Sequence, residues 1–259
     1  MTHYEADTYH PDRYWSERLS RNWSLQSVGY IGYSERYNRY LYRAKVRALR
    51  TAVKAHGIEV RGRAVLDLGP GIGFWLRWFE SKGAGRIAGL EIAEPAVVRL
   101  RAAFPGAVIG HGSISDPWPF EERFDLITAF DVFYHVVDDD AFRSALVEVS
   151  KHLEPGGVFV VTDRMGEVEA RPARHVRFRT NGAYRDALAD CGLRIEGVYP
   201  VYRLLNGALA DSRLIRNKQW LRPVAQRVEN LVAPALYLLD HLPLRAPNLH
   251  LLVARREGS

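Results

Sequence analysis

The fold is decided by the stretch VLDLGPGIGFW at residues 65–75. It starts with aliphatic residues typical of a buried strand, includes the carboxylate of Asp67, and passes through three glycines into a helical pattern. Gly69, Gly71 and Gly73 permit positive φ angles and let a ligand approach where a Cβ would block it. The stretch therefore predicts a strand, a tight turn able to hold a nucleotide-like ligand, and a helix.

A second acidic residue, Glu91, lies in the sequence GLEI at residues 89–92. At the carboxyl end of the next strand, its carboxylate is placed to accept hydrogen bonds from both ribose hydroxyls. A dinucleotide is a competing ligand, but its pyrophosphate needs unobstructed turn amides and G-x-G-x-x-G spacing, whereas this turn contains Pro70. A cofactor without phosphate fits better, and a glycine turn that binds no ligand is the remaining alternative.

Short aliphatic runs alternate with helical patterns along the rest of the chain. Strands are predicted at 64–68, 86–90, 107–109, 124–129, 158–162, 193–199 and 248–254, and helices at 74–81, 95–103, 139–153 and 180–191. Alternating strands and helices form right-handed βαβ units. We therefore expect a doubly wound α/β fold with a mostly parallel seven-stranded sheet and an antiparallel last strand.

Two helical additions are expected around this sheet. Residues 1–57 are predicted to form an N-terminal helical cap or lid that could close over the ligands, since positions 34–56 repeat with helical period and stop at Gly57. Residues 58–259 would form the catalytic domain. Within it, 206–240 reads as a helical insertion before the last strand, whose leucines could line a homodimer contact.

Composition restricts the class of protein. Of the 259 residues, 47% are apolar and 25% charged, an ordinary globular balance, and Cys191 is the only cysteine, which excludes an intrachain disulfide. The N-terminus lacks the pattern of a secretion signal, and no apolar run reaches membrane-spanning length. We expect a cytoplasmic protein without membrane insertion. The formal charge of +6 admits an anionic substrate or a nucleic acid.

The stretch at 65–75 resembles motif I of the class I S-adenosylmethionine-dependent methyltransferases. The sequences FDLI at 124–127 and FDVFYH at 130–135 are similar to the family's fourth strand and its exit, and LEPGG at 153–157 is similar to the turn before its fifth strand. The resemblance covers residues 61–193. It implies a Rossmann-like fold, S-adenosyl-L-methionine as cofactor and methyl transfer as activity.

The resemblance also implies cofactor contacts. Asp67 and the glycine-turn backbone would lie near the methionine part, Glu91 on the ribose and Ile92 against adenine. Where the family often has an acid for the adenine amino group, this chain has Ser113 and Ile114, so backbone and apolar contacts would hold adenine. The expected cofactor-binding set is Asp67, Gly69, Pro70, Gly71, Gly73, Phe74, Glu91, Ile92, Ser113, Ile114 and Phe130.

Three residues are candidate bases. His135 follows the fourth strand, and an imidazole titrates in a range useful for proton removal, although packing or capping is an equal alternative. Glu169 and His175 lie in the charged segment 164–179. His175 with Arg179 resembles a His-x-x-x-Arg element of a branch associated with glycan and natural-product assembly, where this loop lies by the acceptor. A solvated charged loop is the alternative.

Acceptor contacts are expected from the aromatic N-terminus and from the two loops. The expected set is Tyr14, Trp15, Tyr37, Asp131, Arg174 and Arg179, which suits a small polar or anionic molecule. Core packing is the alternative for the aromatic residues. The acids at 138–140 favour a helix start over a metal site, so no metal is predicted.

The leading hypothesis is O-methylation of a sugar or natural-product intermediate. C- or N-methylation of an anionic isoprenoid or aromatic intermediate is an alternative, as is a protein that binds the cofactor without transferring methyl. Modification of a nucleic acid is disfavoured, since arginines are scattered among acids and the sequence FDVF at 130–133 stands in place of an Asn-Pro-Pro-Tyr motif.

Overall fold

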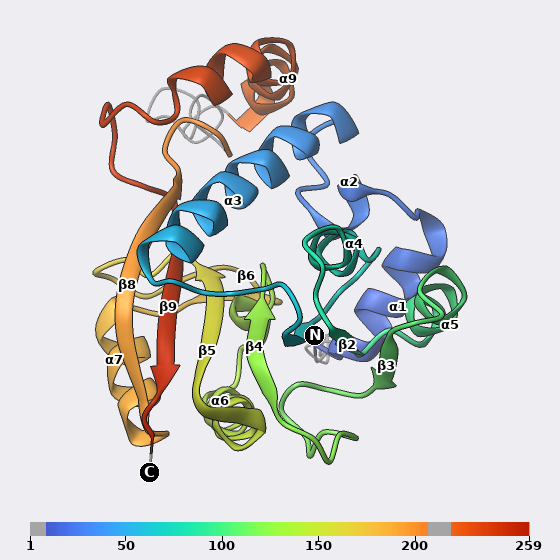
Figure 1. The fold of residues 1–259 in the computed structure, drawn as a ribbon. Coiled ribbons are helices and arrows are strands. Elements are labelled where there is room, and N and C mark those ends of the chain that lie inside the picture. Colours follow the sequence, from blue (N-terminus) through green and yellow to red (C-terminus); the bar gives the residue numbers. More distant parts are fainter. Residues whose placement is uncertain (1–8, 207–218, 259) are drawn as a thin grey trace, which may run out of the picture.

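Strand β1 (Ala64–Leu68) lies inside a seven-stranded sheet in the computed structural model, which describes residues 9–206 and 219–258 (Figure 1). The sheet has the order β3-β2-β1-β4-β5-β9-β8. The other strands are β2 (Arg86–Glu91), β3 (Val108–His111), β4 (Phe124–Ala129), β5 (Leu153–Asp163), β8 (Leu193–Tyr202) and β9 (Leu249–Arg256). The five neighbouring strands β3, β2, β1, β4 and β5 are parallel to one another. Strand β9 is antiparallel to β5 and β8. The predicted doubly wound, mostly parallel sheet is confirmed.

Helices cover both faces of the sheet, because successive strand residues point to opposite sides and both sides are apolar. Val65 belongs to the core that contains α3 (Glu35–Ala55) and α4 (Phe74–Ser81), whereas Leu66 belongs to the core with α6 (Asp139–His152) and α7 (Asn181–Asp190). The remaining crossover helix, α5 (Glu94–Ala103), packs against β3.

The order of the strands reverses at β1, which has β2 on one side and β4 on the other. At such a reversal the loops after the two strands diverge and leave a crevice at the carboxyl edge of the sheet. The glycine turn after β1, Glu91 at the end of β2 and the residues after β4 therefore meet at one edge.

Several predicted elements coincide with the observed ones: 64–68 with β1, 124–129 with β4 and 74–81 with α4. Strand β5 begins earlier than its predicted start at 158, because Leu153 already pairs with Phe124 of β4. The helix predicted at 139–153 consequently ends at His152.

The predicted helical cap contains two separate helices, α1 (Pro11–Arg21) and α2 (Leu25–Val28), whose bounds were not predicted. The strands β6 (Ala170–Ala173) and β7 (Val176–Phe178) were not predicted either. The segment 164–179, predicted as a loop, contains the antiparallel hairpin of β6 and β7. Charged side chains that form ion pairs occupy this hairpin. Because its apolar residues do not alternate with polar ones, the hydrophobic periodicity of the sequence did not predict these strands.

The N-terminal helices and α9 (Arg222–Leu239) complete the structure. Ser34 begins α3 as its N-cap, since its hydroxyl accepts a hydrogen bond from the Tyr37 N–H at 3.2 Å. Helix α9 lies alongside α3 (Figure 1). Of the predicted insertion 206–240, residues 207–218 lie outside the described residues. No helix in the described part of the chain is both long and apolar enough to cross a bilayer.

Candidate functional site

The turn between β1 and α4 requires its glycines. Gly69, Gly71 and Gly73 have φ angles of 66°, 56° and 79°. A Cβ on Gly71 would lie 2.7 Å from a methyl group of Val28 in α2, and a Cβ on Gly69 would lie 2.7 Å from a methyl group of Val132. Side chains from two other segments therefore approach the bare backbone of this turn.

Glu91 connects β2 to the turn. Its Oε2 accepts a hydrogen bond from the Gly71 N–H at 2.9 Å, and its Oε1 accepts one from the Ala93 N–H at 3.0 Å. The side chain is buried, and burial raises the pKa of its carboxyl above the ordinary value. A carboxylate offers about four acceptor positions, so Glu91 can also accept bonds from hydroxyl groups.

Asp67 lies beneath the turn in β1. Its Oδ1 accepts a hydrogen bond from the Thr128 hydroxyl at 2.7 Å, while Oδ2 is buried and has no partner within the described structure. Burial raises the pKa of Asp67 to about 8. A buried polar atom without a partner is costly, and a ligand that donates a hydrogen bond would satisfy it.

A cavity of about 80 Å³ lies against this turn. Nine of the predicted site residues line it, namely Trp15, Gly69, Pro70, Gly71, Glu91, Ile92, Phe130, Asp131 and His135. The lining residues that were not in the predicted set are Leu19, Val28, Tyr42, Trp75 and Val132. Ligand sites usually measure roughly 300–1,000 Å³. The cavity is smaller because Trp15 and Leu19 of α1 and Val28 of α2 close over the turn.

His135 ends the short 3₁₀ helix η1 (Phe133–His135) after β4 and lines the cavity. Its Nδ1 lies 2.7 Å from the carbonyl oxygen of His175. Because a carbonyl only accepts, Nδ1 carries the proton and the lone pair is on Nε2. Burial lowers the pKa of His135 to about 4. The ring is therefore neutral near pH 7, with the lone pair of Nε2 available to accept a proton, and it is a weaker base than an ordinary histidine.

An aromatic cluster, consisting of Tyr14, Trp15, His135 and His175, joins α1 to the β6–β7 hairpin. His175 stacks on Tyr14 with ring centroids 4.8 Å apart, and Trp15 meets His135 edge-on at 5.0 Å. Burial lowers the pKa of His175 below its ordinary value. His175 is thus placed behind His135 and supports it through the backbone carbonyl, and it does not line the cavity.

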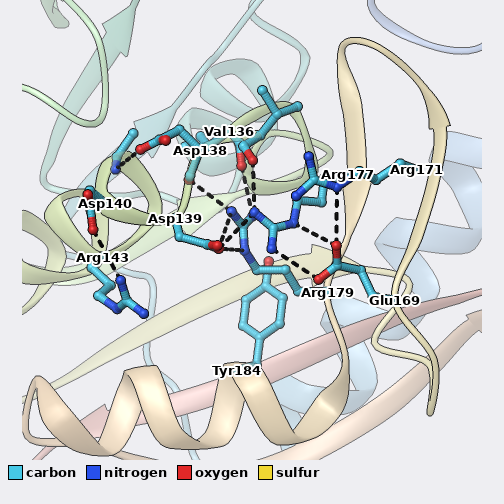
Figure 2. Close-up of polar contacts among 12 residues, drawn as sticks. Val136, Asp138, Asp139, Asp140, Arg143, Glu169, Arg171, Arg177, Arg179 and Tyr184 are labelled. Carbon is cyan, nitrogen blue, oxygen red and sulfur yellow. Dashed lines mark hydrogen bonds and ion pairs between the residues drawn. The ribbon is translucent and has the colours of Figure 1, made fainter.

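Arg179 anchors the hairpin to the segment between η1 and α6 (Figure 2). Its guanidinium is buried and donates to the carbonyl oxygens of Val136 at 2.7 Å and Asp138 at 2.9 Å. It also pairs with Asp139 at 3.2 Å and lies 3.9 Å from the ring centre of Phe142. With these partners, Arg179 fixes the backbone that follows His135.

Glu169 is held by arginines in the same network (Figure 2). It accepts two hydrogen bonds from Arg177, at 3.0 and 3.1 Å, and one from Arg171 at 3.2 Å. The hydrogen bonds from Arg177 lower the pKa of this carboxyl. Glu169 is therefore ionised, a weaker base than an ordinary glutamate, and outside the lining of the cavity.

Asp131 presents a fixed carboxylate to the cavity. It has a φ of 62°, an unusual value for a residue other than glycine. Thr162 accepts a hydrogen bond from the Asp131 N–H at 2.8 Å and donates one to Oδ1 at 3.1 Å. Lys45 of α3 forms an ion pair with Oδ2 of Asp131 and is 1% exposed.

Lys45 was not predicted, although the sequence contains a signal for it. It is a lone charge among the buried positions Leu41, Ala48 and Ala52 of α3, which recur with helical period. A charge is almost never fully buried unless it is paired, so this position indicates a buried partner.

The structure places the other predicted residues outside the cavity lining. Tyr37 is buried beside Tyr33, with its hydroxyl oxygen accepting a hydrogen bond from the Asn206 N–H. Ser113 accepts a bond from the Ser115 N–H, Ile114 packs in the sheet core, and Arg174 is exposed in the hairpin turn. Phe74 contacts Tyr42, and Gly73 begins α4.

The acids at 138–140 begin α6, as the sequence predicts. Asp138 is the N-cap, with its carboxylate accepting the Ala141 N–H at 2.8 Å. Asp139 pairs with Arg177 at 2.8 Å, and Asp140 pairs with Arg143 at 3.2 Å. Among the residues described, no group of three or more His, Cys, Asp or Glu side chains is arranged to hold a metal ion.

Comparison with known proteins gives a consistent result. A family model described as a methyltransferase domain matches residues 34–198. A probable S-adenosylmethionine-dependent methyltransferase of Mycolicibacterium smegmatis is 29% identical over 160 residues, which cover 59% of this chain and 60% of the relative. A dTDP-3-amino-3,4,6-trideoxy-alpha-D-glucopyranose N,N-dimethyltransferase of Streptomyces venezuelae is 30% identical over 99 residues, or 38% and 41% of the two chains. The chain thus matches less than two thirds of the length of either relative.

The fold is shared with solved structures. Magnesium protoporphyrin IX methyltransferase of Synechocystis, solved with bound S-adenosylmethionine, has a TM-score of 0.62 and 12% identity, covering 97% of this chain and 99% of that one. At 12% sequence identity, the similarity between the two structures shows a shared fold and no more.

Proposed function

The chain belongs to the class I S-adenosylmethionine-dependent methyltransferases, and we propose that it transfers the methyl group to a hydroxyl of a small polar or anionic acceptor, with His135 as the base. One observation carries the proposal. A neutral imidazole whose Nε2 has no hydrogen-bond partner among the described residues lines the same cavity as the glycine turn and Glu91.

The residues present fit the cofactor. Asp67 does not line the cavity, but its unpartnered Oδ2 suits the ammonium of the methionine part, whose positive charge would favour the ionised carboxylate. Glu91 has acceptor positions for ribose hydroxyls. Ile92 and Phe130 line the cavity as apolar neighbours for adenine. Ser113 and Ile114 do not line it, so their contact with adenine rests on the resemblance alone. When bound, the cofactor supplies an electrophilic methyl group on a sulfonium.

His135 removes the proton of the nucleophile in this proposal. An alcohol must lose a proton when it is methylated, and Nε2 can accept it. The resulting imidazolium would be stabilised by the bond from Nδ1 to the His175 carbonyl, since a charged donor forms a stronger hydrogen bond. Asp131 would accept hydrogen bonds from acceptor hydroxyls at the same cavity.

Helices α1 and α2 act as a lid in this proposal. Trp15, Leu19 and Val28 cover the cavity, and Leu19 is buried against Ala93 and Ala96. These side chains must move to admit a molecule of cofactor size and would exclude water once they return. We assign residues 1–57 to this cap and 58–259 to the catalytic domain on this basis.

A sugar or natural-product intermediate is the acceptor class that we favour. The His175-x-x-x-Arg179 element and the similarity to a sugar methyltransferase of Streptomyces venezuelae support it. That relative is named as an N,N-dimethyltransferase, which makes N-methylation the second candidate. Tandem mass spectrometry of products from hydroxy and amino sugars distinguishes the two, since the fragments show whether the added methyl group lies on an oxygen or on the amine nitrogen.

The base is tested by His135→Asn. We expect kcat to fall by roughly 10²–10⁴-fold, the usual contribution of a general base, while cofactor affinity stays within about twofold. His241→Asn is the control, because His241 is exposed and does not line the cavity. A His135→Asn enzyme with the turnover of the control would remove His135 from the reaction.

We also propose self-association through α9. Leu231 and Leu238 are 75% and 66% exposed on this helix. Exposed leucines alone do not establish an interface, because they are common on protein surfaces. The molar mass of the protein in solution, measured by light scattering, therefore tests the proposal. A dimer that Leu231→Glu dissociates would support the proposal, and a monomer would overturn it.

A further inference from the structure

A second and larger cavity, of about 530 Å³, lies next to the cofactor cavity. Tyr42 lines both cavities, while α2 contributes Val28 to the first and Leu25 to the second. The two cavities thus share a wall made of one tyrosine and one short helix. The larger cavity has the volume of an organic ligand rather than that of a small ion.

The cavity is lined with positive charge. Arg39, Arg43, Arg47 and Arg50 of α3 line it, and no acidic residue of the described chain does. Their spacing of three and four residues places them on one face of the helix. A face of this kind attracts anions more strongly than the net charge of the chain suggests.

Within residues 9–206 and 219–258, two of the four arginines are without an acidic partner. Arg39 pairs with Glu35 at 2.9 Å, and Arg47 pairs with Asp240 at 3.1 Å. Arg43 lies 5.1 Å from the ring centre of Tyr40, and neither Arg43 nor Arg50 has a carboxylate within ion-pair distance among the described residues. Two helical turns, roughly 10 Å, separate them along α3.

The rest of the lining is aromatic and apolar. Tyr42 and Phe74 form one wall, with ring centroids 4.5 Å apart, and Tyr237 of α9 also lines the cavity. A guanidinium binds phosphate oxygens in a two-pronged geometry, and aromatic faces accept a flat ring. The lining therefore suits a molecule that carries both a phosphate group and a ring.

From this arrangement we propose that the arginine-lined cavity binds the phosphate-bearing part of the acceptor, with Arg43 and Arg50 holding the phosphate. This inference rests on the proposed function. Movement of α2 would displace Leu25 and Val28 together and join the two cavities past Tyr42. The acceptor would then be an organic phosphate or diphosphate, whose uncharged end reaches His135.

The test is calorimetric titration of the full chain with thymidine diphosphate, in the presence of saturating S-adenosylhomocysteine. We expect the double variant R43Q/R50Q to bind the nucleotide at least about tenfold more weakly, and wild-type affinity to fall as salt increases. The charge-matched control is R123Q/R185Q, two exposed arginines outside this lining, which should retain wild-type affinity.

Three results would overturn the inference: no binding of the nucleotide to the wild-type chain, equal affinity in wild type and R43Q/R50Q, or equal loss in the control. Inorganic pyrophosphate, which has no ring, is the second probe. If it binds as tightly as the nucleotide, the aromatic lining does not contribute to binding, and that part of the inference is overturned. Affinity for S-adenosylhomocysteine should be unchanged in every variant. This outcome is independent of His135→Asn, so failure of the cavity and failure of the proposed base are separable.

Discussion

At the scale of single residues, the site depends on side chains whose pKa values are shifted by burial. Asp67 and His135 are both buried, yet the effects on them are opposite. Burial disfavours the charged form, so it raises the pKa of a carboxyl and lowers that of an imidazole. The apo site accordingly favours a protonated Asp67 below pH 8 and a neutral His135 above pH 4.

The pH dependence of turnover follows from His135. Its pKa of about 4 means that the basic form persists throughout the range in which an ordinary histidine near 6.5 would become protonated. We expect kcat, measured with saturating cofactor and acceptor, to show no acid limb near pH 6.5 and to decline only below about pH 5. An acid limb centred near 6.5 that His135→Asn abolishes would contradict the lowered pKa of His135, although it would agree with its role as the base.

The pH dependence of stability follows from Asp67. Its folded-state pKa of about 8 lies above the unfolded value of about 3.9, so its contribution is fully present below pH 4 and is lost as the pH rises through 8. We expect Asp67→Asn, which does not titrate, to lose less stability between pH 5 and pH 8. The difference should approach about 1 kcal/mol per pH unit in urea unfolding of the apo protein. Parallel curves for the two proteins would exclude a raised pKa.

At the scale of elements, the β6–β7 hairpin fixes the segment that carries His135. Arg179 donates to two backbone carbonyls of the segment before α6, and the His175 carbonyl accepts the Nδ1 proton of His135. The hairpin therefore controls both the orientation and the tautomer of the base.

Arg179→Met tests this connection. Loss of the guanidinium leaves the carbonyls of Val136 and Asp138 without their donor, which should cost roughly 3 kcal/mol of stability. We expect kcat to fall while KM for the cofactor changes little, because the glycine turn and Glu91 are untouched. Arg143→Met, at an exposed ion pair of α6, is the matched control and should change neither. Wild-type kcat in a folded Arg179→Met protein would show that the hairpin does not position the base.

The sequence predicted those elements whose local pattern matches their final environment. β1 and β4 are short apolar runs buried on both faces, and Ser34 caps α3, so local chemistry determines their bounds. The β6–β7 hairpin was missed because its charged side chains show no apolar alternation. Its ion pairs with Asp139 join segments that are separated in the sequence, and no local pattern contains such pairs.

At the scale of the whole molecule, the cofactor-site residues from β1, β2 and the exit of β4 were predictable, whereas of the covering residues only Trp15 was in the predicted set. Leu19, Val28 and Tyr42 reach the cavity from N-terminal helices, and their position depends on how α1, α2 and α3 pack against the sheet. Packing between distant segments follows from the assembled shape, not from the order of residues. The lid was thus expected from the sequence only as a region, whereas most of its contact residues and the arginine-lined cavity beside it became visible only in the structure.

The central claim is that the glycine turn and Glu91 form one binding site for the adenosyl cofactor. Isothermal titration calorimetry with S-adenosylhomocysteine tests it most directly, comparing wild type with Glu91→Ala. Glu91 accepts bonds from the turn and offers positions for ribose hydroxyls. We predict one binding site per chain in the wild type and affinity at least about tenfold weaker in Glu91→Ala, as loss of hydrogen bonds to a charged group implies. Absence of binding to the wild-type protein, or equal affinity of the two proteins, would contradict the claim.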